Sequence, residues 1–94
     1  MTSKQRAKLK SIASTEDTIL QIGKGGITQQ VIKQADDALT AREIIKIKVL
    51  ETAPDEIKSL AAEMSEATNS EVVQIIGTKI IIYRNNPEKN LIKL

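Results

Sequence analysis

Residues 18–28 read TILQIGKGGIT and join a β-rich run to the start of a helix. The run Thr18–Ile22 contains β-branched residues at three of its five positions, which favours a strand. Beyond the turn, apolar residues recur with helical period from Ile27 to Leu39, and Thr28 stands where a helix N-cap belongs. Three glycines within four residues predict a tight turn that leads directly from the strand into the helix.

This glycine turn is also a candidate binding site. Glycine lets another backbone come close, so a lysine in the turn would stand over bare peptide groups. The helix start behind it carries unpaired amide groups and a partial positive charge, which suit a phosphate oxygen. The spacing is also that of the Gly-x-x-Gly loop with which KH modules clamp four nucleotides. A purely structural turn explains the glycines equally well. The candidate residues are Gly23, Lys24, Gly25 and Gly26.

Short strands and amphipathic helices alternate along the rest of the chain. Pro54 is expected to open a helix whose outer face is acidic, and Gly77-Thr78 is a two-residue hairpin turn. The expected elements, in order, are a docking helix over 3–13, a strand over 18–22, a helix from 28, a strand over 43–51, a helix over 54–68, strands over 71–76 and 79–84, and an irregular tail over 85–94.

These elements predict a single α/β (α+β) domain over residues 1–94, with the order α-β-α-β-α-β-β. Alternation of strands and helices implies a crossover between parallel strands, and the final hairpin adds an antiparallel pair. We therefore expect a small mixed sheet of about four strands, with the two larger helices on one face and the N-terminal helix as an addition.

The composition leaves little for catalysis. Cysteine and histidine are both absent, which removes thiolate and imidazole ligands, cysteine nucleophiles and the usual neutral-pH base. Neighbouring carboxylates such as Asp36-Asp37 point about 100° apart on a helix and do not converge on one atom. We expect no enzyme activity, no cofactor and no metal site. The polar N-terminus and the lack of an apolar run of about 20 residues also predict a cytoplasmic protein that does not enter a membrane.

Positive charge gathers in the front half of the chain. Residues 1–50 hold nine Lys or Arg against five Asp or Glu, whereas residues 51–94 hold five against seven. No acidic residue occurs in 1–15, although like charges four apart disfavour the helix there. These cations either bind a ligand or serve solubility. The candidates in this helix are Lys4, Arg6, Lys8 and Lys10.

Further candidate cations lie on the predicted strands. Lys46 and Lys48 alternate with apolar residues and are expected to face solvent or a ligand, although exposed lysines also protect strands from aggregation. Arg84 is either a phosphate contact or a solvated strand end. Tyr83 is the only aromatic residue, so the stacking platforms of single-strand binders cannot be built. Recognition of a nucleic-acid backbone and its shape remains.

Motifs along nearly the whole chain resemble the CRM domain family, in particular its stand-alone bacterial YhbY-like members. The resemblance rests on Thr2-x-Lys4-Gln5-Arg6, Gly23-Lys24-Gly25-Gly26-Ile27-Thr28, Glu43-Ile44-Ile45-Lys46-Ile47-Lys48-Val49, Val73-Gln74-Ile75-Ile76-Gly77 and Ile82-Tyr83-Arg84. It implies a fold similar to the C-terminal domain of translation initiation factor three. It further implies RNA binding, with ribosomal RNA in large-subunit precursors as the target and ribosome assembly as the role.

The same resemblance places the family's Gly-x-x-Gly loop on residues 23–26 and its basic surface on Lys4, Arg6, Lys46, Lys48 and Arg84. Two features depart from the pattern. Family members often carry histidines where this chain has Ser14-Thr15 and Ala41-Arg42, and the loop here follows a strand, while in KH domains it joins two helices.

We expect a monomer that binds RNA, with a possible ribosomal-protein contact at the acidic helix. The alternative is a protein-interaction module that uses the exposed sheet face without binding RNA. In that case the lysines would only keep the sheet soluble.

Overall fold

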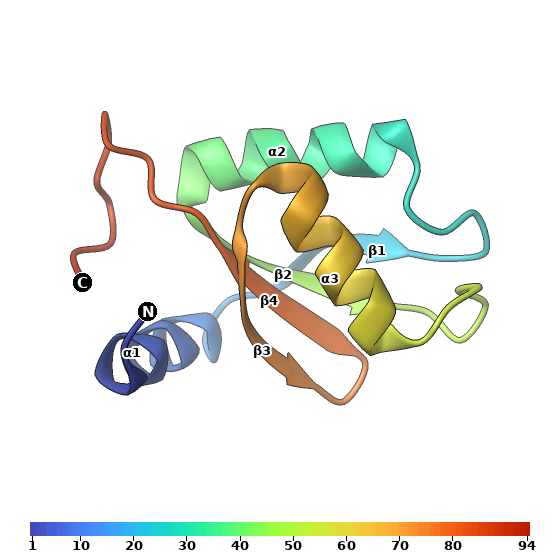
Figure 1. Cartoon of the computed structure of the whole chain (residues 1–94), viewed down its shortest axis with the longest axis horizontal. Helices are drawn as coiled ribbons and strands as arrows, with labels where there is room; N and C mark the ends of the chain where they lie inside the picture. The colour runs from blue at the N-terminus through green and yellow to red at the C-terminus, as the bar shows by residue number, and fades with distance from the viewer.

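The computed structural model describes residues 1–94 as a four-stranded mixed sheet with helices on both faces (Figure 1). β1 (Thr18–Ile22) runs parallel to β2 (Ile44–Val49), and the helix α2 (Gln29–Arg42) connects them. β3 (Glu71–Ile76) and β4 (Lys79–Tyr83) form an antiparallel hairpin. Because β4 pairs with β2, the strand order is β1-β2-β4-β3. The predicted element order and fold class are confirmed.

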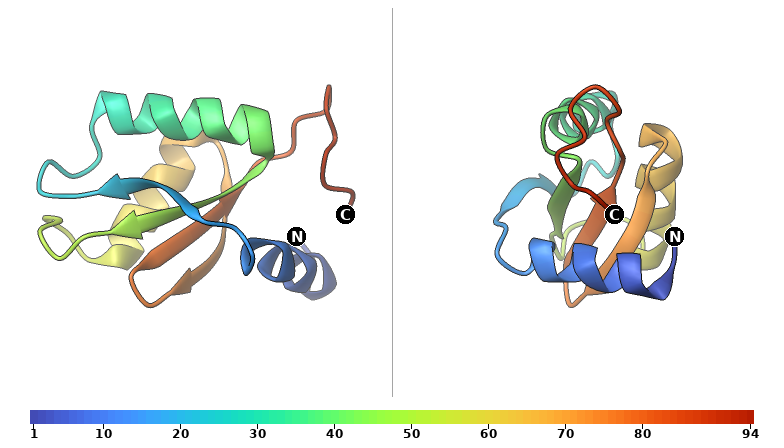
Figure 2. Two further views of the ribbon diagram at one scale, coloured as in Figure 1. Left: turned by 180° about the vertical axis from the view of Figure 1, so that it is seen from behind. Right: turned by 90° about the vertical axis from the view of Figure 1, so that its left-hand side faces the viewer.

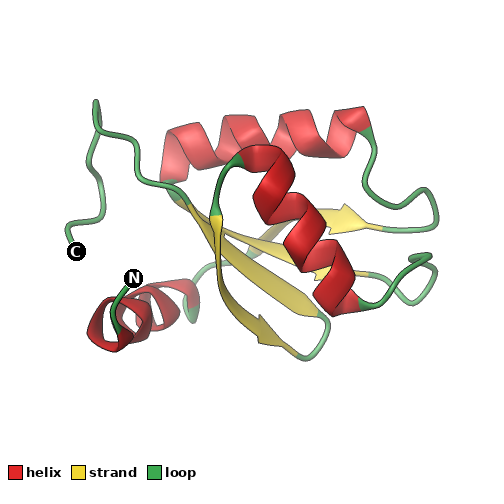
Figure 3. Ribbon diagram, in the orientation of Figure 1, coloured by secondary structure: helices red, strands yellow, loops and turns green.

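The main core lies between the sheet and the helices α2 and α3 (Ile57–Thr68), which share one face of the sheet (Figure 3). In β2 and β4, alternate residues point toward these helices, as the period of two requires. Thr28 caps α2, because its Oγ1 accepts the amide of Val31 at 3.1 Å. The buried residues of this core are Ile22, Ala35, Leu39, Ile45, Ile47, Val49, Leu60, Ala61, Met64, Ile80 and Ile82.

The first helix, α1 (Ser3–Ala13), covers part of the opposite face of the sheet (Figure 2). The apolar side of this predicted docking helix packs on the sheet, with Leu9 and Ala13 buried against strand residues that include Ile44 and Tyr83. The predicted capping box at its start is also present. None of the three helices is both long and apolar enough to cross a membrane.

Three connections lie toward one end of the sheet. In Figure 1 the glycine turn and the β2–α3 connection are on the right, and the β3–β4 turn is at the bottom. The carboxyl ends of the parallel strands β1 and β2 meet there, since the Leu50 amide donates to the Ile22 carbonyl at 2.9 Å. The β3–β4 turn meets the same edge, because the Val49 amide donates to the Thr78 carbonyl at 2.7 Å. The glycine turn and the hairpin turn are thus brought to the same end of the molecule.

The expectation that Pro54 opens a helix is wrong. α3 begins at Ile57, after an N-cap at Glu56 that makes no side-chain cap hydrogen bond. Pro54 instead lies against the glycine turn, where a Cβ added to Gly26 would come 3.1 Å from its Cγ. The proline rigidifies the connection between β2 and α3.

The last ten residues contain no helix or strand, as predicted, but they are held to the domain. Glu43, fully buried at the end of α2, accepts the backbone amides of Asn86, Leu91 and Ile92 at 3.1, 3.0 and 2.8 Å. Ile92 also packs on the cluster beneath α1. One carboxylate therefore organises the C-terminal segment.

Candidate functional site

The glycine turn divides into a structural half and an open half. The Gly26 amide donates to the Gly23 carbonyl at 2.9 Å and closes the turn. Gly26 is buried at a φ of 67°, a conformation that favours glycine, and it faces Pro54. Gly25 is exposed, and a Cβ there would meet only the Thr28 side chain at 3.7 Å. Lys24 and Gly25 are therefore the part of the turn that a ligand can reach.

Acidic residues lie beside this turn. The β2–α3 connection that packs against Gly26 carries Glu51, Asp55 and Glu56, and all three are exposed. Their negative charges offset the positive charge of Lys24 and the partial positive charge of the α2 N-terminus. The electrostatic potential at the turn is consequently mixed.

The predicted cations of α1 have different environments. Arg6 is half-buried, and its Nη1 donates to the carbonyls of Val72 and Val73 at 2.8 and 2.7 Å, which ties α1 to β3. Lys8 is exposed and donates to the Lys93 carbonyl of the C-terminal segment. Lys4 and Lys10 are exposed, and neither forms an ion pair.

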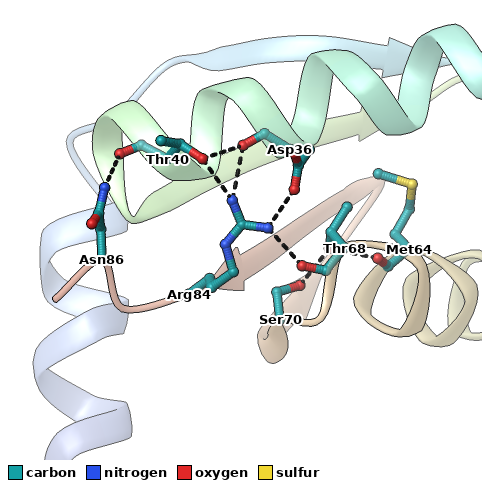
Figure 4. Close-up of polar contacts among 7 residues, drawn as sticks. All are labelled: Asp36, Thr40, Met64, Thr68, Ser70, Arg84 and Asn86. Carbon is teal, nitrogen blue, oxygen red and sulfur yellow. Dashed lines mark hydrogen bonds and ion pairs between the residues drawn. The ribbon is translucent and has the colours of Figure 1, made fainter. Parts of the chain in front are cut away.

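Arg84 is part of a polar network that joins two helices to the sheet (Figure 4). Its Nη1 donates to a carboxylate oxygen of Asp36 at 2.5 Å and to the Thr68 carbonyl at 2.7 Å. Its Nη2 donates to the Asp36 carbonyl at 3.0 Å and to the Thr40 hydroxyl at 2.9 Å. Both terminal nitrogens of the guanidinium thus hold α2, α3 and β4 together, and a phosphate would have to compete with these partners.

The lysines of β2 are less exposed than their alternation suggested. Lys48 is half-buried, whereas Lys46 keeps only 9% of its surface exposed. Lys46 is less open to solvent than Lys48 because α1 covers Ile44 and the sheet next to it. Neither lysine forms an ion pair.

A groove of about 450 Å³ opens between the end of α1 and the β3–β4 hairpin, on the α1 face of the sheet. Lys10 and Lys46, both predicted from the sequence, come together there with Lys79, which the sequence reasoning missed. Counting from the Gly77-Thr78 turn would have placed Lys79 opposite Ile76 at the start of β4. Its position across from Lys48 results from the pairing of β4 with β2, which the hairpin turn does not determine. The lining residues are Lys10, Ser14, Lys46, Gln74, Ile76, Gly77, Thr78, Lys79 and Ile81.

The ionisable groups with shifted pKa values lie away from this groove. Burial raises the pKa of the Glu43 carboxyl, but its three backbone N–H donors outweigh that effect and hold it below its ordinary value. Burial raises the pKa of the Tyr83 hydroxyl, and the charges of Glu43 and Glu71 raise it further. No group of three or more His, Cys, Asp or Glu residues is placed to hold a metal ion.

Sequence comparisons identify relatives across the whole chain. The model of the CRS1 / YhbY (CRM) domain matches residues 1–84. The probable RNA-binding protein YqeI of Bacillus subtilis is 37% identical over 94 residues, which cover 100% of this chain and 98% of that protein. The probable RNA-binding protein PA4753 of Pseudomonas aeruginosa is 31% identical, with 96% of this chain and 86% of the relative covered.

A solved structure shares the same fold. The solution structure of the hypothetical protein SAV1595 from Staphylococcus aureus, for which RNA binding has been suggested, superposes with a TM-score of 0.84. The two chains are 51% identical, and the match covers 100% of this chain and 98% of the other.

Proposed function

This chain belongs to the CRS1 / YhbY (CRM) domain family, and on that premise we propose that it binds RNA through contacts to phosphates. The names of its relatives support RNA as the ligand. The observation that carries the proposal is that none of the predicted lysines has a carboxylate partner. The structure contains two ion pairs, and their cations are Lys33 and Arg84. The unpaired lysines are Lys4, Lys8, Lys10, Lys24, Lys46 and Lys48.

The finer proposal is that the RNA is ribosomal RNA in precursors of the large subunit and that the protein assists ribosome assembly. The family resemblance suggests this target. With one aromatic residue, and that one buried at Tyr83, the chain has no exposed ring on which bases could stack, which favours contacts to an RNA backbone. We further propose that the protein acts in the cytoplasm as a monomer without catalytic activity. A ribosomal-protein contact on the acidic face of α3 belongs to the same proposal.

A salt titration of RNA binding tests the proposal. Two labelled probes, an oligouridylate and a fully paired RNA duplex, are titrated with the protein at several salt concentrations. Contacts to phosphates release counterions, so log K should fall with log salt with a slope of about −0.7 per contact for the single strand. Absence of measurable binding to both probes at low salt would refute the proposal.

A protein-interaction module is the second candidate, and Ile76 favours it. This residue is 53% exposed on the edge strand β3, where a partner strand could add to the sheet. Against this candidate, α1 already covers part of the free sheet face, and lysines occupy much of the remainder. The same titration separates the two candidates, because an interaction module would show no salt-dependent affinity for RNA.

A further inference from the structure

The groove beside the β3–β4 hairpin has an electrostatic arrangement that folding alone does not explain. Three lysines line it, and none of its nine lining residues is acidic. Lys48 of β2 stands directly opposite Lys79 of β4 in the antiparallel register. Like charges directly opposite each other destabilise a sheet. An anion held between them would remove that repulsion.

Lys46 is the most constrained of these cations. With 9% of its surface exposed, its aliphatic stem is buried on the sheet, while its ammonium group reaches the groove without an ion-pair partner. Lysines this deeply placed are normally paired. A fixed ammonium also loses less side-chain entropy on binding than a free surface lysine. Lys46 is therefore suited to bind a phosphate group.

A β-bulge in β3 directs the uncharged side chain of Gln74 into the same groove. The register shifts between Val72 and Gln74, so Val73 packs under α1 while Gln74 lines the groove opposite Ile81. In a regular strand these two successive side chains would point to opposite faces. Bulges are over-represented at sheet edges and next to active sites, where they re-aim a side chain, and β3 is an edge strand. The Gln74 amide can both donate and accept hydrogen bonds.

The remaining wall supplies apolar surface and hydroxyls. Ile76 and Ile81 form the apolar part, and Ser14 and Thr78 add hydrogen-bonding groups. The volume of about 450 Å³ lies within the range of small-molecule pockets. Cations, an amide and an aliphatic surface within one groove match three features by which a nucleotide is recognised, namely its phosphate, the edge of its base and the face of its base.

We infer that this groove holds one unpaired nucleotide of an RNA strand, an inference that rests on the proposed function. The phosphate lies between the opposed Lys48 and Lys79, with Lys46 beside them. The base packs on the exposed Ile76, and the Gln74 amide bonds the edge of the base. An unpaired nucleotide can enter because its base is free to leave the stack, whereas the faces of bases within an A-form duplex are covered by stacking.

Three variants test the inference with the two RNA probes of the salt titration. Lys48→Gln with Lys79→Gln removes the opposed pair, and Gln74→Leu removes the amide. Lys33→Gln with Lys89→Gln is the matched control, because it removes the same charge from exposed residues that do not line the groove. Thermal melting checks the fold of each variant.

The lysine pair variant should bind oligouridylate at least tenfold more weakly than the control and flatten the salt slope by about 1.4. Its melting temperature should equal or exceed that of the wild type, since a repulsion is removed. Gln74→Leu should weaken oligouridylate binding at least threefold with an unchanged slope. Duplex binding should match the control in both cases.

Equal losses in the pair variant and the control, or equal losses for oligouridylate and duplex, would overturn the groove assignment. An unaffected Gln74→Leu variant would overturn the base contact. If the wild type binds the duplex but not oligouridylate, the groove inference fails while RNA binding stands. If it binds neither probe, both proposals fail.

Discussion

At the scale of single residues, the structure separates the predicted cations by side-chain type. Arg6 and Arg84 each donate to two backbone carbonyls of segments distant in the chain, whereas among the predicted lysines only Lys8 bonds a backbone carbonyl. A guanidinium can bridge several carbonyls in fixed geometry, while an ammonium remains a hydrated point charge. Sequence position alone could not reveal this division, because the partners of Arg6 lie 66 and 67 residues away.

The Arg84 network leads to a prediction about stability. Arg84→Lys should lower the free energy of unfolding by about 1–3 kcal/mol, because a lysine cannot reproduce the contacts to Asp36, Thr40 and Thr68. RNA affinity should change less than twofold. Urea denaturation and RNA titration measure the two effects, with the exposed Arg42→Lys as control. Arg84 would instead be a phosphate contact if affinity fell tenfold while stability held.

Glu43 leads to a prediction about pH. Its pKa is lower in the folded protein than its ordinary value of 4.5, because the ionised carboxylate accepts three backbone amides. The stabilisation it provides is therefore present above the unfolded pKa and is lost as the pH falls through the folded pKa. The wild-type protein should lose stability as the pH is lowered below 4.5.

Glu43→Gln should lower the free energy of unfolding at pH 7 by about 2 kcal/mol or more, since a neutral amide oxygen cannot replace a buried charged acceptor of three bonds. The variant should also show a weaker pH dependence than the wild type. Urea denaturation at pH 7 and at pH 3.5 measures both effects, and the exposed Glu88→Gln is the control. Identical pH profiles of the two variants would contradict this role of Glu43.

At the scale of elements, local sequence patterns predicted which helices and strands form but not which segments pack against them. Capping residues and periodicity correctly predicted α1, the start of α2 and the β3–β4 hairpin. Alternation in β2 distinguished its two faces, yet it could not show that α1 lies over Ile44 and beside Lys46, because that contact joins distant parts of the chain. Pro54 was misassigned for the same reason, since its packing against Gly26 is a tertiary contact.

The glycine turn offers a test in which two neighbouring glycines should behave differently. Lys24→Asp with Gly25→Asp should weaken RNA binding at least tenfold, about 1.4 kcal/mol, while the fold is retained, because a Cβ at Gly25 would make only an ordinary contact with the Thr28 side chain. Gly26→Ala should instead lower the free energy of unfolding by about 1–2 kcal/mol, since Gly26 has a φ of 67° and adjoins Pro54. RNA titration and urea denaturation measure these effects.

Gly25→Asn provides the matched control for the turn, because it adds a side chain of similar shape without charge. If the aspartate variant keeps its fold and its affinity, the turn is purely structural. RNA contacts would then be confined to the lysines of α1 and the sheet.

At the scale of the whole molecule, the sheet topology brings the glycine turn and the groove to the same end of the sheet. The glycine turn follows β1, and the hairpin turn before Lys79 meets the same edge through the Val49–Thr78 hydrogen bond. From that edge the groove leads to the end of α1 at Lys10. The glycine turn that carries Lys24 and the groove lined by Lys79 therefore lie at the same end of the sheet. Helix α3 covers the other face of the sheet, where a protein contact would not compete with RNA in the groove.

If this surface binds ribosomal RNA before the large subunit is complete, the protein should sediment with large-subunit precursors and be depleted from translating ribosomes. Sucrose gradients of cell extracts, probed with an antibody against the chain, measure its distribution. The Lys48→Gln, Lys79→Gln variant should shift to the top of the gradient, whereas the Lys33→Gln, Lys89→Gln control should remain with the precursors. Because both variants lose two positive charges, a difference between them must come from position and not from net charge. An even spread of the wild type over free protein and polysomes would contradict the assembly role. RNA binding itself is tested separately by the titrations.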